Sequence, residues 1–195
     1  MTKKISILLL FFYLIFQPVL AENNALKIGS DRAKLTIKVF SSLTCPHCAN
    51  FHNNIFEDLQ KEYINNSKVK FEHHGFPLDL AALNAEKIVR CTTNIKIRFN
   101  LLSEIYKKQS IWAVGSDINI INDSLKKIGL TFGLNEKQLN KCLEDEKVQD
   151  QILNERIDAQ KNYKISSTPT IFINEKKYEG KHDFDSFKKT LNKLL

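Results

Sequence analysis

The chain lacks several features that would place it in other protein classes. Its 195 residues contain no internal repeat and no low-complexity linker, so we expect one domain with some elaboration. It has no second Cys-x-x-Cys and no His-x-x-x-His, two spacings typical of zinc sites. The formal net charge is +7, but the basic residues are spread along the chain rather than clustered. This distribution gives no indication of a nucleic-acid partner.

The first residues have the pattern of a secretory signal peptide. Two lysines precede an almost uninterrupted apolar run from Ile5 to Phe16, which Pro18 ends. The run is short for a membrane-spanning helix, which needs about 20 apolar residues, although an uncleaved anchor is the alternative. We predict cleavage after Ala21, so that residues 1–21 are removed on export. The exported thiols would then meet an oxidising space in which disulfides persist.

The motif Cys45-Pro46-His47-Cys48 carries the chemistry of this chain. Residues 35–40 are apolar or β-branched and predict a strand before the motif, and apolar residues at steps of three and four predict a helix after it. Cys45 would then lie at a helix N-terminus, where unpaired N–H groups favour a thiolate. His47, when protonated, would lower the thiol pKa further. We predict that Cys45 is the nucleophile, that Cys48 resolves the mixed disulfide, and that the two form a redox-active disulfide.

A second candidate segment, Thr168-Pro169-Thr170, directly precedes a short apolar run, Ile171 to Ile173. A proline in this place either starts the strand or holds a cis peptide bond in a tight turn. The strand, the Cys-Pro-His-Cys motif on a helix and the Thr-Pro before a later strand together resemble the thioredoxin fold. The Pro-His pair between the cysteines and the long helical stretch in the middle resemble the DsbA family of exported thiol–disulfide oxidoreductases.

The resemblance implies a periplasmic enzyme that introduces disulfides into newly exported, cysteine-containing proteins, without an organic cofactor. It implies that a membrane quinone-linked oxidase reoxidises Cys45 and Cys48. It also implies that Pro169 is cis and packs beside the disulfide, and that the backbone at Thr168 pairs with a substrate segment. Members of the family often carry a buried acidic residue in the strand before the motif. Here that strand offers Lys38 instead, which calls into question a proton relay to Cys48.

The rest of the chain predicts an α/β protein, a thioredoxin-like fold with a central mixed sheet and an all-helical insertion. The alternating run Val69 to Phe76 predicts a strand parallel to the first, because a helical crossover joins them. Helical signals fill residues 80–163, and we expect an insertion at about residues 78–146 within a domain of residues 22–195. The expected helices are Leu80–Cys91, Ile95–Tyr106, Asp117–Ile128, Glu136–Leu143 and Val148–Tyr163. A hairpin of Ile171–Ile173 with Lys177–Glu179 and a last helix capped by Asp183 would complete the fold.

The two remaining cysteines allow a structural disulfide. Four cysteines allow three pairings, and if Cys45 pairs with Cys48, then Cys91 and Cys142 remain. Both lie on apolar faces of expected helices in the insertion. A bridge would close a loop of about 50 residues and stabilise the fold by about 3–5 kcal/mol. Two inert buried thiols are the alternative.

Two other functions fit the same motif. A disulfide reductase or isomerase could use the same fold, although isomerases usually add a dimerisation module for which this chain has little room. A non-catalytic metal carrier could use Cys45 and Cys48 together with a nearby histidine. An oxidising space works against a stable thiolate site, so we predict no metal and expect His52, His73 and His74 to be structural. Haem attachment requires a histidine directly after Cys48, where the chain has alanine.

Overall fold

The sheet is at the centre of the fold, and it is mixed, as the sequence predicts. A computed structural model describes residues 25–195, so the expected signal peptide lies outside the described residues. The strands run in the order β1-β3-β2-β4-β5. β2 pairs with β3 in parallel and with β4 in antiparallel orientation. Their bounds are β1 Leu26–Ile28, β2 Leu35–Ser41, β3 Val69–Gly75, β4 Thr170–Ile173 and β5 Lys176–Lys177.

The main core lies on the face of the sheet that the helix after the motif covers. The predicted apolar stripe on that helix is buried. The ring of Phe51, which belongs to this stripe, packs against the ring of Phe187 from the C-terminal helix. Alternate strand residues such as Ile37 and Val39 point into the same core. The helical run is not purely α-helical, because two stretches have π-helical hydrogen bonding. The segments are α1 Pro46–Phe51, η1 His52–Phe56, α2 Glu57–Leu59, η2 Gln60–Ile64 and, at the C-terminus, α9 Phe184–Leu194.

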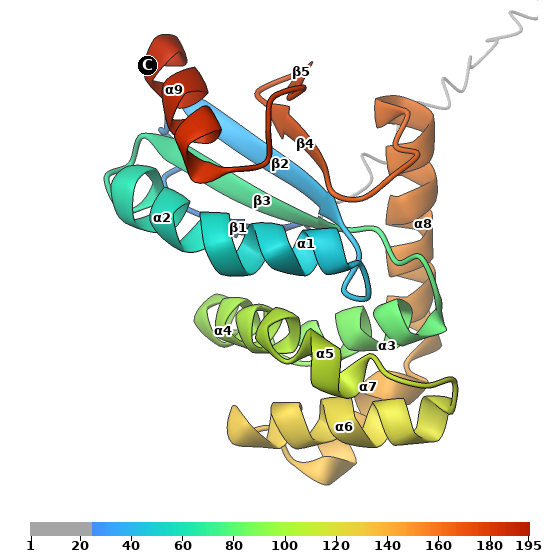
Figure 1. The fold of residues 1–195 in the computed structure, drawn as a ribbon. Coiled ribbons are helices and arrows are strands. Elements are labelled where there is room, and N and C mark those ends of the chain that lie inside the picture. Colours follow the sequence, from blue (N-terminus) through green and yellow to red (C-terminus); the bar gives the residue numbers. More distant parts are fainter. Residues whose placement is uncertain (1–24) are drawn as a thin grey trace, which may run out of the picture.

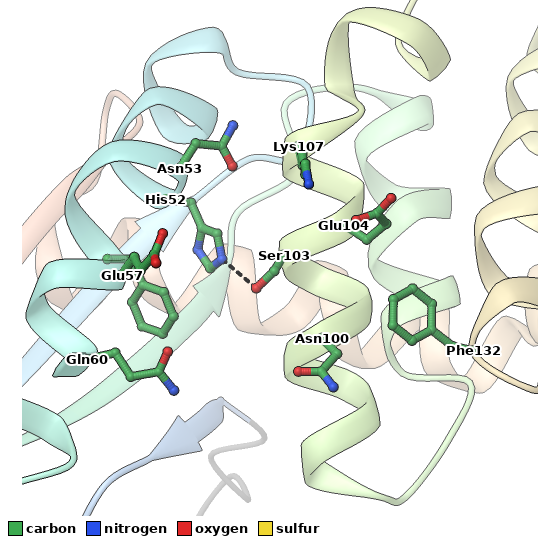
Figure 2. A pocket seen from close by; sticks show the side chains of 10 residues that line it. His52, Asn53, Glu57, Gln60, Asn100, Ser103, Glu104, Lys107 and Phe132 are labelled. Atoms are coloured by element: carbon green, nitrogen blue, oxygen red, sulfur yellow. Dashed lines mark hydrogen bonds between the residues drawn. The ribbon is translucent and has the colours of Figure 1, made fainter.

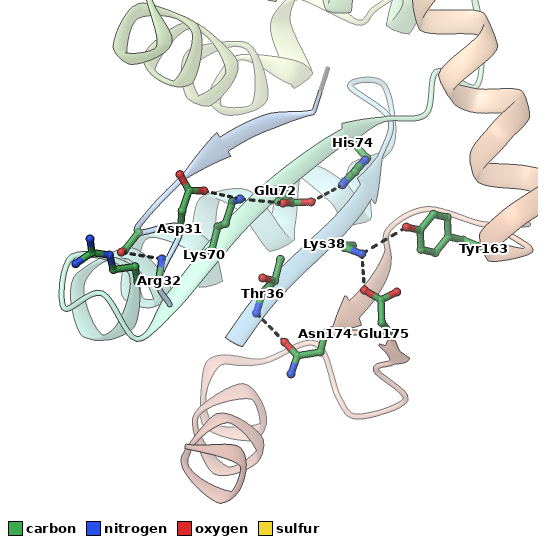
Figure 3. Close-up of polar contacts among 11 residues, drawn as sticks. Asp31, Arg32, Thr36, Lys38, Lys70, Glu72, His74, Tyr163, Asn174 and Glu175 are labelled. Atoms are coloured by element: carbon green, nitrogen blue, oxygen red, sulfur yellow. Dashed lines mark hydrogen bonds and ion pairs between the residues drawn. The ribbon is translucent and has the colours of Figure 1, made fainter. Parts of the chain in front are cut away.

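The opposite face of the sheet is partly apolar and partly covered by ion pairs. The long helix α8, Glu146–Tyr163, lies beside the sheet (Figure 1). Its Tyr163 packs there against a small core that contains Phe40 and Phe172. Polar side chains take the neighbouring places on β2 and β3 (Figure 3). One set is Asp31, Lys70, Glu72 and His74, and the other joins Lys38 to Glu175 and Tyr163. The sheet therefore separates two environments, and a side chain on this face does not reach the main core.

The helices between β3 and α8 lie together on the side of α1 that faces away from β4 and α9 (Figure 1). They are α3 Leu80–Val89, α4 Ile95–Lys107, α5 Gln109–Trp112, α6 Ile118–Thr131 and α7 Glu136–Glu144. A disulfide joins Cys91 to Cys142, with a Cα–Cα distance of 5.6 Å, and so ties the end of α3 to α7. Cys91 lies beyond α3, because the helix ends at Val89 rather than at the expected residue 91. None of the helices described is long and apolar enough to cross a membrane.

Short elements account for the other differences from the expected fold. The sequence reasoning missed β1, whose three residues are too few to show an alternating pattern and which pairs antiparallel with β3. The second hairpin strand is Lys176–Lys177 rather than Lys177–Glu179, because a two-residue turn, in which Asn174 adopts a positive φ of 54°, pairs Ile173 directly with Lys176. The side chain of Asp183 accepts a hydrogen bond from the Ser186 N–H and caps α9, as expected.

Candidate active site

The Cys-Pro-His-Cys motif lies where β2 leads into α1. Cys45 is the N-cap residue of α1, with extended backbone angles of φ −79° and ψ 120°. Its N–H donates to the Ser42 carbonyl at 3.1 Å, which closes a tight turn between the strand and the helix. Pro46 occupies the first helical turn, where an N–H would have no intrahelical partner. The local sequence thus places the first cysteine at the positive end of the helix, as predicted.

The two motif cysteines differ in accessibility. Both are free thiols, with 8% of Cys45 and 1% of Cys48 exposed. Pro46 and His47 between them are exposed to solvent. A partner sulfur can therefore approach Cys45 more easily than Cys48, which is the order of accessibility that a nucleophile and a resolving thiol require.

The Thr168-Pro169 segment lies directly against Cys45, although 123 residues separate them. The Thr168–Pro169 peptide bond is cis. The thiol of Cys45 donates to the Thr168 carbonyl at 3.3 Å. Sheet pairing explains the proximity: Phe40 near the end of β2 is the partner of Thr170 at the start of β4, so the loops beyond these residues meet. The fold therefore brings together the two segments that the sequence analysis selected.

The surroundings of Cys45 stabilise its thiolate. Its pKa is lowered to about 5, chiefly by a hydrogen bond from the Cys48 thiol, with burial opposing this effect. The Thr168 side chain and the backbone N–H groups of His47 and Cys48 also lower the pKa. The Thr168 hydroxyl is buried and has no hydrogen-bond partner among the described residues. A thiolate cannot donate to the Thr168 carbonyl, whereas the Thr168 hydroxyl is a donor available to it.

Cys48 is affected in the opposite direction. Burial raises the pKa of Cys48 far above its usual range, and the hydrogen bond to Cys45 and the negative charge on that sulfur raise it further. The pair therefore holds one proton on Cys48 and one negative charge on Cys45 at neutral pH. Such an arrangement stabilises the reduced form of a dithiol and makes the corresponding disulfide a stronger oxidant.

Two residues near the motif escaped the sequence analysis. Tyr106 of α4 is buried, its hydroxyl has no hydrogen-bond partner among the residues described, and burial and the charges of Cys48 and Glu86 raise its pKa. Gln109 of α5 donates to the backbone carbonyls of Leu43 and Cys45. Neither residue belongs to a recognisable motif, since both reach the site from the helices inserted after β3. Lys38, which occupies the strand before the motif, bonds to Glu175 on the far face.

The histidines outside the motif have structural partners, as expected. His52 bonds to Ser103 at 2.9 Å beside an open polar groove of about 690 Å³ between α4 and the helix after the motif (Figure 2). Burial lowers the pKa of His52 to about 3. His73 bonds to Glu86 at 2.9 Å within the core, and His74 stacks on Phe40. Residues 25–195 contain no group of three or more His, Cys, Asp or Glu side chains suited to a metal ion.

Comparisons with known proteins agree with this fold. Residues 21–193 match the model of the thioredoxin family. A Rickettsia bellii protein, named provisionally as a protein-disulfide oxidoreductase, is 27% identical over 174 residues, which is 89% of this chain. The match covers 66% of that protein, so this chain spans less than two thirds of its length. Disulfide bond formation protein D of Bacillus subtilis is 28% identical over 86% of this chain and 76% of its own length.

Solved structures show the same architecture. The crystal structure of Wolbachia pipientis alpha-DsbA1 superposes with a TM-score of 0.80 at 27% identity, over 88% of this chain and 91% of the other. Oxidised BdbD from Bacillus subtilis superposes with a TM-score of 0.74 over 87% and 92% of the two chains, at 24% identity. The fold is therefore that of DsbA-like proteins, and the chain belongs to the thioredoxin family.

Proposed function

We propose that this protein is an exported thiol–disulfide oxidoreductase that introduces disulfides into secreted or envelope proteins. The observation that carries the proposal is the contrast between the two motif cysteines. Cys45 has a pKa lowered to about 5 and faces the Thr168 carbonyl, whereas Cys48 is buried and holds its proton. A cysteine that is a stable thiolate is a good leaving group, so the Cys45–Cys48 disulfide is readily transferred.

The reaction proceeds by two thiol–disulfide exchanges. A substrate thiolate attacks Cys45 in the oxidised protein, the Cys45–Cys48 bond breaks, and Cys48 leaves and takes up a proton. A second substrate thiolate then attacks the substrate sulfur of the mixed disulfide, and Cys45 leaves as a thiolate. The substrate loses two electrons and two protons and gains a disulfide, while Cys45 and Cys48 become the reduced pair. A membrane quinone-linked oxidase would accept those electrons and restore the disulfide.

Thr168 and Pro169 are the proposed substrate-binding residues. Their loop lies beside Cys45, and Thr168 directly precedes the cis bond. An extended substrate segment that pairs with the Thr168 backbone would bring its cysteine next to the Cys45 sulfur. His47 is exposed and lies between the cysteines, where its positive charge would favour the thiolate.

Trapping experiments test these roles. In Cys48→Ala the Cys45 thiolate can attack a client disulfide and displace one client thiolate, but no Cys48 thiol is present to release the client, so we expect the mixed disulfide through Cys45 to accumulate. In Cys45→Ala we expect no such adduct, because Cys48 is only 1% exposed. An adduct that forms in Cys45→Ala and not in Cys48→Ala would reverse the assigned roles.

The direction of electron flow is tested by the reduction potential of the Cys45–Cys48 couple against glutathione. A strongly oxidising couple supports the proposed donor of disulfides, whereas a reducing couple supports a reductase or isomerase on the same fold. A parallel metal titration tests the alternative function, a non-catalytic metal carrier that uses Cys45 and Cys48. Tight metal binding by the reduced protein, together with negligible oxidation of a dithiol peptide, would overturn the proposed enzyme.

A further inference from the structure

Gln109 connects the inserted helices to the backbone that carries Cys45. Its Nε2 donates to the Leu43 carbonyl at 2.7 Å and to the Cys45 carbonyl at 3.0 Å. Both hydrogens of the side-chain amide are therefore used, and each acceptor belongs to the turn between β2 and α1. Gln109 is 9% exposed, so water does not readily replace these bonds.

The position of Gln109 is itself fixed by packing. It is the first residue of α5, which follows α4 with only Lys108 between them. Trp112, at the other end of α5, is 2% exposed and donates from its indole nitrogen to the Ile105 carbonyl at 2.8 Å. The short helix α5 is thus anchored to α4, and it holds the amide of Gln109 in one place.

The two carbonyls that Gln109 binds lie on either side of Thr44. The Leu43 carbonyl belongs to no strand or helix, and Gln109 is its partner inside the protein. The Cys45 carbonyl also accepts from the N–H groups of Cys48 and Ala49, which begin α1. Gln109 therefore fixes the orientation of the Cys45 peptide relative to the helix N-terminus. The sulfur of the same residue lies 3.3 Å from the Thr168 carbonyl, so a shift of the Cys45 backbone would move the sulfur relative to that loop.

We propose that Gln109 is a positioning residue that holds Cys45 at the N-terminus of α1 and against the Thr168 loop, and so supports the thiolate that leaves during exchange. The inference depends on the proposed function, because it assigns Gln109 a part in that reaction. Gln109 acts through the backbone and touches neither sulfur. Because Gln109 belongs to α5, the activity of the motif would depend on the inserted helices as well as on the sheet.

The test replaces Gln109 with methionine, which fills a similar volume but cannot donate. We expect Gln109→Met to make Cys45 roughly a tenfold weaker acid and to shift its equilibrium with glutathione roughly tenfold toward the disulfide, which is about 30 mV. The matched control is Gln138→Met. Gln138 donates to the Cys91 carbonyl at 2.9 Å within the inserted helices, far along the chain from the motif. We expect this control to change stability but neither the acidity of Cys45 nor the glutathione equilibrium.

A second variant keeps the test decisive if Gln109→Met does not fold. Gln109→Asn retains both donors on a side chain one methylene shorter, so it cannot reach both carbonyls, and we expect a smaller change in the same direction. An unchanged Cys45 acidity and glutathione equilibrium in the folded Gln109 variants would overturn the inference, as would an equal change in Gln138→Met. A wild-type couple that is already reducing would instead overturn the proposed function, whatever the variants show.

Discussion

The hydroxyl of Thr168 offers the sharpest test of how this site stabilises a thiolate. Thr168→Val removes the hydroxyl and keeps the branched shape of the side chain. The hydroxyl is buried without a hydrogen-bond partner among the described residues, and the side chain of Thr168 is one of the groups that lower the pKa of Cys45 to about 5. We therefore expect the substitution to act on the thiolate and to leave the packing of the loop intact.

The magnitude follows from the strength of one hydrogen bond to a charged group, which is about 1.5–3 kcal/mol. Because Cys45 keeps 8% of its surface exposed, solvent compensates in part and the lower end of that range applies. About 1.4 kcal/mol corresponds to a factor of ten, so Thr168→Val should make Cys45 roughly a tenfold weaker acid. The reduced form loses the same stabilisation, which makes the couple about 30 mV more reducing.

Two measurements check this expectation. The ultraviolet absorbance of the thiolate, followed against pH, gives the acidity of Cys45, and equilibration with glutathione gives the potential. Thr170→Val is the matched control, because the Thr170 hydroxyl donates to the Ser167 carbonyl at 2.7 Å in the same loop. It should lower stability in both redox states without changing the acidity of Cys45.

Comparing the two redox states shows whether the Thr168 hydroxyl stabilises the thiolate or stabilises the fold in general. Only the reduced protein has a thiolate that the hydroxyl can stabilise, so Thr168→Val should destabilise the reduced form and not the oxidised form. Equal destabilisation of both forms, or an unchanged acidity of Cys45, would refute the reasoning.

Two further predictions concern stability. The pKa of Cys45 is lowered from 9.0 to about 5, so between these values the unfolded chain binds more protons than the folded one, and the free energy of unfolding of the reduced protein should rise from about pH 5 to pH 9. The difference in unfolding free energy between the reduced and the oxidised protein, measured with a denaturant against pH, should show this slope, and a flat difference would contradict it. The disulfide between Cys91 and Cys142 joins residues 51 apart, so opening it by the double substitution to serine should cost about 4 kcal/mol in the same assay. Unchanged stability would show that the bridge does not constrain the unfolded chain.

Local signals in the sequence were sufficient for most of the elements. The strand at residues 35–41 and the parallel strand at residues 69–75 follow from apolar alternation and from the crossover rule, and both are present. Helices α3, α4, α6, α7 and α8 lie close to their expected bounds. The short elements were harder to predict. β1 and α5 were not expected, and the bounds of β5 were shifted, because two to four residues carry no period and only contact with a neighbouring element defines them.

The strand before the motif shows why a single position is harder to interpret. Lys38 occupies the strand in which related proteins often carry a buried acid, and the sequence does not tell to which face it points. In the fold it bonds to Glu175 and Tyr163 on the face away from Cys48. A polar side chain that does act on Cys48 is that of Thr168, which lowers its pKa and comes from the loop before β4, far along the chain.

The sequence by itself determined the chemistry of the motif, because the helix N-terminus, the proline in the first turn and the spacing of Cys45 and Cys48 depend only on neighbouring residues. The tertiary structure decided the acidity of each thiol and which distant residues contact the motif. Burial separated the pKa values of the two thiols, the pairing of β2 with β4 brought Thr168 to the sulfur of Cys45, and α5 supplied Gln109. These effects depend on distance and on exclusion of water between residues far apart in the chain, which no local pattern specifies.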